Sequence, residues 1–163
     1  MVNNIKIIKN NSFKDHRGYY WTSWRKNLNS NIKYNHDKFS LSKKNVLRGL
    51  HGDKKTWKLV SCVYGKIFLV IVNFNKSSRN YLKWKSWTLT HENGLQILIP
   101  PNYANGHLCL SDICVFHYKL SYKGSYSGPG KQFSLKWNDP KINIKWPVKY
   151  PILSARDKKT KFL

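Results

Sequence analysis

The sequence predicts an all-β fold, a jelly-roll sandwich or barrel with short helical segments. The chain of 163 residues is long enough for one domain with a sizeable core and too short for two. Short runs of β-branched and aromatic residues follow one another closely, and turn-forming Gly, Pro and Asn residues separate them. We therefore expect residues 1–163 to form a single domain that ends in a basic tail at 158–163.

The expected strands are runs in which apolar residues alternate with polar ones or in which β-branched and aromatic residues are continuous. In chain order they are Ile5–Ile8, Gly18–Trp24, Phe39–Lys43, Lys58–Tyr64, Ile67–Asn73, Lys83–Thr90, Gln96–Ile99, Cys114–Leu120 and Phe133–Trp137. The one candidate for a short helix is Ser23–Asn29. Many short strands at close spacing in one domain are typical of a jelly roll.

Turn signals lie between the expected strands, at Gly65, Asn93-Gly94, Pro100-Pro101-Asn102, Asn105-Gly106 and Gly124 to Gly130. The connection at Gly65-Lys66 is short enough to predict a hairpin between Lys58–Tyr64 and Ile67–Asn73.

Alternation in the first strand of this pair places Lys58 on the same face as Val60 and Cys62. Lys58 then either keeps its charged end in water at the mouth of a barrel, or points inward as a cation aimed at a substrate oxygen.

The composition is strongly basic, with 30 Lys and Arg against 7 Asp and Glu and a net charge of +23. A hydrophobic fraction of 40% excludes a disordered basic tail. Most of the cations are scattered lysines, as in a solvated coat, and the alternatives are polyanion binding and steering of an anionic substrate. Because carboxylates are scarce, each aspartate is a candidate for a specific role: Asp15, Asp53, Asp112, Asp139 and Asp157.

Three features predict a cytoplasmic protein that does not bind a membrane. No apolar run reaches the length of a membrane helix, and the N-terminus lacks the apolar region of a secretory signal. The cysteines Cys62, Cys109 and Cys114 are odd in number and have no paired spacing, which favours free buried thiols in a reducing compartment.

The chain lacks the common motifs of nucleotide-binding and metal sites. The chain has no glycine-rich phosphate loop of the ATP or dinucleotide type. It also has no CxxC motif and no closely spaced histidines, the patterns that would indicate a metal site. What remains is Arg48, His51 and Lys58 on apolar segments close together in the chain. A lone histidine is more often structural than catalytic, but its ordinary pKa suits a general base near neutral pH.

A family resemblance begins at these residues. The run Val46-Leu47-Arg48-Gly49-Leu50-His51, followed by Lys58-Leu59-Val60, resembles the pattern of the dTDP-4-dehydrorhamnose 3,5-epimerases, sugar-nucleotide enzymes of the cupin superfamily. Ordered matches extend from Asp15-His16-Arg17-Gly18 to Leu153-Ser154 and Asp157, over nearly the whole chain. The resemblance implies a cupin-type jelly roll, a homodimer, and no metal or organic cofactor.

The resemblance also implies the catalytic roles. The family's substrate is a nucleoside-diphosphate 4-keto-6-deoxy sugar, whose C3 and C5 protons are acidic because they flank the C4 ketone. By position, His51 matches the base and Asp157 the carboxylate that orients it. Lys58 matches the residue that stabilises the enolate, and Tyr118 matches the acid that returns a proton from the opposite face.

The resemblance assigns substrate binding to Arg48, Arg17, Asn105, Lys38 and Tyr122, with the Arg17 segment reaching across a dimer interface. Several of these positions depart from the family pattern. Asn105 and Lys38 stand where most members have His and Asn, and Tyr122 is what remains of a tyrosine pair. The loop after His51 is short, with Gly52-Asp53 in place of the common Tyr-Gln.

The leading interpretation is therefore an epimerase that inverts C3 and C5 of a nucleoside-diphosphate 4-keto-6-deoxy sugar. The enzyme alternative acts on a GDP-4-keto-heptose or inverts C3 alone. The non-enzyme alternative is an inactive basic module that binds nucleic acid, which we do not expect, since such a module has no need of His51, Lys58, Tyr118 and Asp157 together. Whether Trp21 and Trp24 lie in a dimer interface or in the core stays open.

Overall fold

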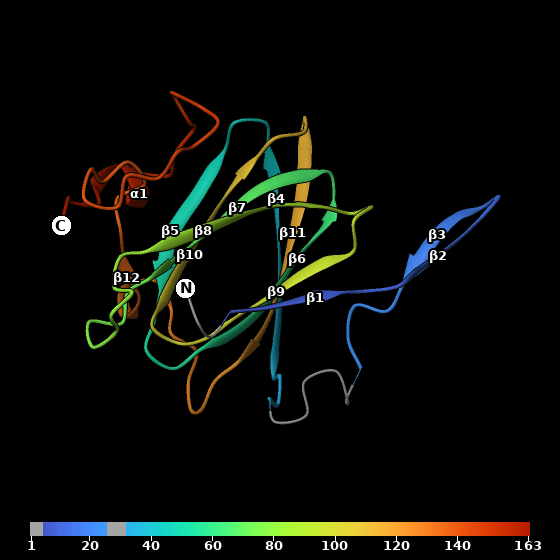
Figure 1. Ribbon diagram of the computed structural model, residues 1–163, viewed down its shortest axis with the longest axis horizontal. Coiled ribbons are helices and arrows are strands. Elements are labelled where there is room, and N and C mark those ends of the chain that lie inside the picture. The colour runs from blue at the N-terminus through green and yellow to red at the C-terminus, as the bar shows by residue number, and fades with distance from the viewer. Residues whose placement is uncertain (1–4, 26–31) are drawn as a thin grey trace.

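Two five-stranded antiparallel sheets pack face to face in the computed structural model, which describes residues 5–25 and 32–163 (Figure 1). The first sheet has the order β1-β9-β6-β11-β4 and the second the order β12-β5-β10-β7-β8. This arrangement is a jelly-roll sandwich, so the predicted all-β jelly-roll fold is confirmed.

The bounds of the elements follow the sheet order. The first sheet consists of β1 (Lys6–Lys9), β9 (Leu95–Ile99), β6 (Trp57–Tyr64), β11 (Ile113–Ser121) and β4 (His36–Lys43). The second consists of β12 (Phe133–Ser134), β5 (Leu47–Gly52), β10 (Tyr103–Cys109), β7 (Lys66–Asn73) and β8 (Trp84–Thr90). A separate hairpin pairs β2 (Ser12–Asp15) with β3 (Gly18–Trp21), and the helical segments are η1 (Pro129–Lys131) and α1 (Ala155–Lys159).

The apolar core lies mainly between the two sheets. Val60 and Cys62 of β6 pack there with Ile67, Leu69 and Ile71 of β7. The opposite face of β7 is also buried, because the segment after β12 covers the second sheet. Burial on both faces explains why β7 reads as a continuous apolar run rather than an alternating one.

The predicted hairpin between Lys58–Tyr64 and Ile67–Asn73 is wrong. Both strands form, but β6 pairs with β9 and β11, whereas β7 pairs with β10 and β8 in the other sheet. Gly65 has φ +76 and carries the chain from one sheet to the other, where a side chain would collide with Ile113 and Ser111. Two strands with apolar inner faces are thereby placed opposite each other across the core.

Three strands and two short helical elements, η1 and α1, were not predicted at their positions. The strands are β2, β5 and β10, and the predicted turn at Asn105-Gly106 is wrong because both residues lie inside β10. The predicted helix Ser23–Asn29 falls partly on residues 26–31, which lie outside the described residues. The tail at 158–163 begins inside α1 and ends with the backbone N–H of Leu163 donating to Asp139 at 2.7 Å.

The three cysteines are free and buried, as their spacing predicted. Burial raises the pKa of Cys62 to about 12, so its thiol stays protonated and unreactive at neutral pH. Within the described ranges, no helix has the length and apolar character needed to cross a membrane.

His107 of β10 is a polar group placed in the core. It is fully buried and packs against Phe116 with the ring centroids 4.2 Å apart and the rings tilted by 34°, and neither ring nitrogen has a hydrogen-bond partner among the described residues. Burial, together with the charge of Arg48, lowers the pKa of His107 to about 3. The ring is therefore neutral in the folded protein across the physiological range.

We predict that His107→Phe stabilises the protein by about 1–2 kcal/mol at pH 7, because it removes two unsatisfied buried nitrogens and keeps the aromatic packing. The gain should grow on acidification below the ordinary histidine pKa of 6.5, since protons then bind the unfolded chain but not the buried ring. Denaturant unfolding of both proteins at pH 7 and pH 5 measures both effects. A gain that is the same at the two pH values would contradict this account of His107.

Candidate active site

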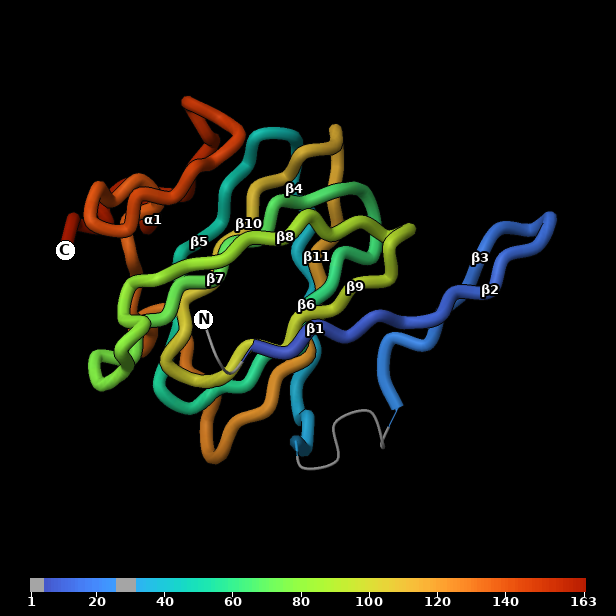
Figure 2. The backbone as a smooth tube through the Cα atoms, in the orientation of Figure 1, coloured from blue at the N-terminus to red at the C-terminus, as the bar shows by residue number. Residues whose placement is uncertain are grey.

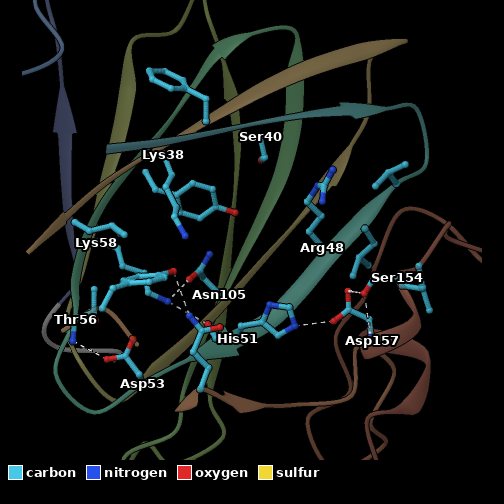
Figure 3. Close-up of a pocket in the computed structure, with 18 of the residues that line it drawn as sticks. Lys38, Ser40, Arg48, His51, Asp53, Thr56, Lys58, Asn105, Ser154 and Asp157 are labelled. Carbon is cyan, nitrogen blue, oxygen red and sulfur yellow. Dashed lines mark hydrogen bonds and ion pairs between the residues drawn. The ribbon is translucent and has the colours of Figure 1, made fainter. Parts of the chain in front are cut away.

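A cavity of about 450 Å³ opens between the two sheets at one end of the jelly roll (Figure 3). Its wall is built from both sheets, from two loops and from the C-terminal segment. The lining residues are Lys38, Phe39, Ser40, Val46, Leu47, Arg48, His51, Asp53, Thr56, Lys58, Asn105, Tyr118, Leu120, Tyr126, Gln132, Ile152, Leu153, Ser154 and Asp157.

His51 and Asp157 form a hydrogen-bonded pair in this cavity. His51 Nε2 lies 2.6 Å from Asp157 Oδ1, although 106 positions separate the two residues in the chain. Burial raises the pKa of Asp157, but the hydrogen bond to His51 and its charge, with the Ser154 bond, outweigh burial and the net pKa is lowered. An ionised Asp157 accepts the proton on Nε2 and leaves Nδ1 as the ring nitrogen that can take a proton.

The C-terminal segment brings Asp157 to His51 by running beside β5. The backbone N–H of Leu47 donates to Ile152 at 3.0 Å, and that of Ile152 donates to Asn45 at 2.8 Å. The Ser154 hydroxyl caps α1 by accepting the N–H of Asp157 at 3.1 Å, and it donates to Asp157 Oδ2 at 2.8 Å. Both carboxylate oxygens are thereby held in place.

Gly49 allows β5 to approach β10 closely enough to place His51 beside Asn105. It has φ +118, and a side chain there would lie 2.6 Å from Gly106 Cα and 2.7 Å from the Asn105 carbonyl oxygen. Only glycine fits this position. The paired glycines of the two strands therefore fix the spacing of the cavity wall.

Lys58 is the interior cation of the cavity. Its side chain is 7% exposed, and its ammonium donates to Asn105 Oδ1 at 2.7 Å and to the His51 carbonyl oxygen at 3.2 Å. Burial lowers the pKa of Lys58 to about 8, and the charge of Asp53 opposes this effect. Of the two orientations considered from the sequence, the structure shows the inward one.

Tyr118 lies on the wall opposite His51, since β11 and β5 belong to different sheets. Its ring packs edge-on against Phe116 at 4.4 Å between centroids. Burial raises the pKa of Tyr118 well above its ordinary value, so the phenol is protonated at neutral pH and is a proton donor.

The predicted binding residues are only partly gathered at the cavity. Arg48 lines it, and its guanidinium is held by Ser42 Oγ at 2.9 Å and the Leu41 carbonyl at 3.0 Å. Lys38 also lines it, with its ammonium 4.0 Å from the centre of the Tyr126 ring. Tyr122 does not line the cavity, and its hydroxyl lies 3.1 Å from His36 Nδ1.

Arg17 does not line the cavity of its own chain. It lies in the β2–β3 hairpin, which extends away from the two sheets (Figures 1 and 2), and it pairs with Asp15 at 2.6 Å.

Sequence reasoning missed several lining residues, notably Ser40, Thr56, Tyr126 and Gln132, and it did not assign Ser154 or Asp53 to the site. Ser154 had a usable signal, because Ser three residues before Asp is typical of a helix N-terminus. Tyr126 and Gln132 lie in irregular chain that carries no periodic pattern.

Comparisons with known proteins match this architecture over the whole chain. The family model described as dTDP-4-dehydrorhamnose 3,5-epimerase matches residues 1–163. The enzyme of that name from Salmonella typhimurium strain LT2 is 35% identical over 165 residues, which cover 96% of this chain and 88% of the relative. The one from Methanothermobacter thermautotrophicus is 33% identical, with coverage of 95% and 87%.

Solved structures that superpose on this chain belong to the same family of enzymes. The dTDP-4-dehydrorhamnose 3,5-epimerase of Bacillus anthracis, with TDP and pyrophosphate bound, superposes with a TM-score of 0.92 at 29% identity, covering 99% of this chain and 95% of that one. The dTDP-6-deoxy-D-glucose-3,5-epimerase of Legionella pneumophila, in complex with dTDP-4-keto-L-rhamnose, gives 0.88 at 33% identity, covering 97% and 87%. The chain belongs to the dTDP-4-dehydrorhamnose 3,5-epimerase family.

Proposed function

We propose that this chain inverts C3 and C5 of a dTDP-4-keto-6-deoxy sugar by removing and returning protons next to the ketone. The observation that carries the proposal is the His51–Asp157 pair in a cavity that also holds Lys58 and Tyr118. Family membership supports the substrate class. In this proposal residues 1–163 act as one domain, and the buried free thiols are consistent with the cytoplasm.

The geometry supports a stepwise reaction in which His51, Lys58 and Tyr118 each have one role. His51 Nδ1 removes the proton at C3 or C5, and Asp157 stabilises the imidazolium that forms. The resulting enolate carries its negative charge on the C4 oxygen, where the Lys58 ammonium stabilises it. Tyr118 then donates a proton from the opposite wall, which inverts the carbon. This chemistry requires only a base, a cation and an acid.

Substrate binding follows from the charge of the cavity. Arg48 and Lys38 both line it and present cationic groups that can hold a diphosphate, and Arg48 is preorganised by its bonds to β4. Asn105 holds Lys58 through its amide oxygen, and Tyr122 supports the wall through His36. Much of the remaining positive charge of the chain lies in solvent and attracts an anionic substrate at long range.

Incubation with dTDP-4-keto-6-deoxyglucose in D₂O, followed by NMR, tests the reaction. We expect deuterium at both C3 and C5, and none with His51→Asn, which lacks the base. Deuterium at C3 alone would replace the proposal with a single inversion. Exchange only with a GDP-4-keto-heptose would replace the sugar, and no exchange with either would exclude the epimerase activity.

Loss of the carboxylate should slow the reaction through His51. We expect Asp157→Asn to lower kcat/KM by about 100-fold or more, because the amide neither fixes the tautomer nor stabilises the imidazolium. Ser154→Ala removes the bond to Oδ2 and the cap bond of α1 but leaves the bond between His51 and Asp157 in place, so it should cost much less. Steady-state rates together with melting temperatures make the comparison, and an Asp157→Asn enzyme of full activity would contradict the assigned role.

The protonation of Lys58 sets the alkaline limit of activity. Since its pKa lies at about 8, the fraction of charged ammonium falls above that pH and the rate should fall with it. A pH–rate profile measures this limit. Lys58→Met should be inactive, whereas the same change at the exposed Lys66 should leave the profile unchanged. A rate that is constant to pH 10 would contradict the assignment.

The proposed enzyme is a homodimer in which Arg17 serves the partner's cavity. The β2–β3 hairpin exposes Phe13 and Tyr20, which are 61% and 66% exposed, and β4 exposes Phe39 and Leu41. Trp24 is 38% exposed and belongs to neither core cluster of the described residues, which favours a place in the dimer interface over one in the core. Such apolar surface is typical of a face covered by another subunit.

Mixing two inactive variants tests this assembly. If Arg17 acts in the partner's cavity, Arg17→Ala and His51→Asn subunits should together regain activity, because the mixed dimer contains one intact site. Light scattering gives the mass independently. A monomer, or mixtures without activity, would contradict the shared site.

A further inference from the structure

Asp53 is a buried carboxylate of the cavity wall that the mechanism above does not use. It is 4% exposed, and its Oδ1 accepts the backbone N–H groups of Lys55 at 2.9 Å and Thr56 at 2.7 Å. These bonds fix the carboxylate in a tight turn after β5. Its Oδ2 is buried and has no hydrogen-bond partner in the part of the chain that the structure describes.

The side chain of Lys55, whose backbone N–H donates to Asp53, does not neutralise this carboxylate. The Lys55 ammonium turns away and donates to the carbonyl oxygens of Lys123 at 3.3 Å and Ser125 at 2.5 Å. Burying a negative charge is costly unless a positive charge lies close by. The cation that compensates Asp53 must therefore come from elsewhere in the cavity.

Lys58 is likewise a buried charged group, of the opposite sign to Asp53. Its buried ammonium donates to two neutral oxygens, those of Asn105 and His51, and forms no direct ion pair within residues 5–25 and 32–163. The other carboxylate of the cavity, Asp157, is engaged by His51 and Ser154. Asp53 and Lys58 line the same end of the cavity, as Figure 3 shows.

We propose that Asp53 is the counter-charge of Lys58: its fixed, buried carboxylate keeps the Lys58 ammonium charged and therefore able to stabilise the enolate. Asp53 acts through Lys58 and is a positioning residue. The inference rests on the proposed function only for the role of Lys58 in the reaction, not for the coupling between the two charges.

The groups around Lys58 explain why the charge of a single carboxylate affects its protonation. The other titratable groups that line its cavity are Lys38 of β4, Arg48 and His51 of β5, Tyr118 of β11, Tyr126, and Asp157 of α1. The strand β9, which pairs with β6 at Lys58, has no titratable side chain, and His107 of β10 is held neutral. The positive charges of Lys38 and Arg48 favour a neutral Lys58 once a neutral residue replaces Asp53.

Two neutral replacements, Asp53→Asn and Asp53→Ser, keep an oxygen for the turn and remove the charge. The titration of Lys58 is followed by NMR of ¹³Cε-labelled lysine, with its signal assigned through Lys58→Met. We expect its midpoint to fall by about one pH unit or more in both variants. The alkaline limb of the rate profile should move by the same amount, so that at pH 9 the rate drops by about tenfold relative to the native enzyme while at pH 6.5 it changes little.

Asp112→Asn is the matched control, because it also removes one negative charge but at a residue whose side chain is 92% exposed and paired with Lys44. It should leave the Lys58 midpoint unchanged. The double variant Asp53→Asn/Lys58→Met removes both charges, so it should be more stable toward denaturant than Lys58→Met alone, and it decides the matter if the single Asp53 variants fail to fold. An unchanged Lys58 midpoint in a folded Asp53 variant, or a double variant that is no more stable than Lys58→Met, would overturn the proposal. Absence of turnover in the native enzyme would instead refute the proposed function, since the NMR titrations do not depend on turnover.

Discussion

The hydrogen bond between His51 and Asp157 is the interaction on which the site depends. It joins β5 to the last helical turn of the chain, and it requires the segment after residue 150 to run beside the start of β5. A buried carboxylate fixes which nitrogen of the imidazole carries its proton, and so determines which nitrogen can act as a base. Without this bond the C-terminal segment would still pack, but His51 would be an ordinary half-buried histidine.

The two-sheet architecture supplies the second constraint. An inversion at carbon needs groups on both faces of the substrate, and a cavity between two sheets has two walls by construction. His51 comes from one sheet, whereas Lys58 and Tyr118 come from the other. Gly49 sets how closely β5 lies to β10, and therefore where His51 lies relative to Asn105 and Lys58. The backbone of the jelly roll thus fixes the distances that the chemistry requires.

The sequence predicted the strands wherever burial leaves a local pattern. Alternation placed Lys58 with Val60 and Cys62 correctly, because successive side chains of a strand point to opposite faces of the sheet even where both faces are buried. It failed at β10, where Asn105 and Gly106 resemble a turn but are held inside a strand by pairing with β5 and β7. It also failed for the β6–β7 connection, since a short turn within a sheet and one between sheets have the same local composition.

The site could be predicted only in part for the same reason. His51, Lys58, Tyr118 and Asp157 came from ordered matches to a family pattern, and the structure brings all four to one cavity. Asp53 and Thr56 carry no local sign of burial, because their environment is created by residues far away in the chain. The net charge of +23 does not locate the site, whereas the buried aspartates are informative because each is held by specific partners.

The tautomer of His51 is the property that tests this account most directly. Long-range ¹H–¹⁵N NMR of the ring distinguishes a protonated from an unprotonated nitrogen at each position. The account predicts that Nε2 carries the proton and Nδ1 does not near neutral pH, and that Asp157→Asn abolishes this preference. A proton on Nδ1 in the native protein, or the same tautomer with and without the carboxylate, would contradict it.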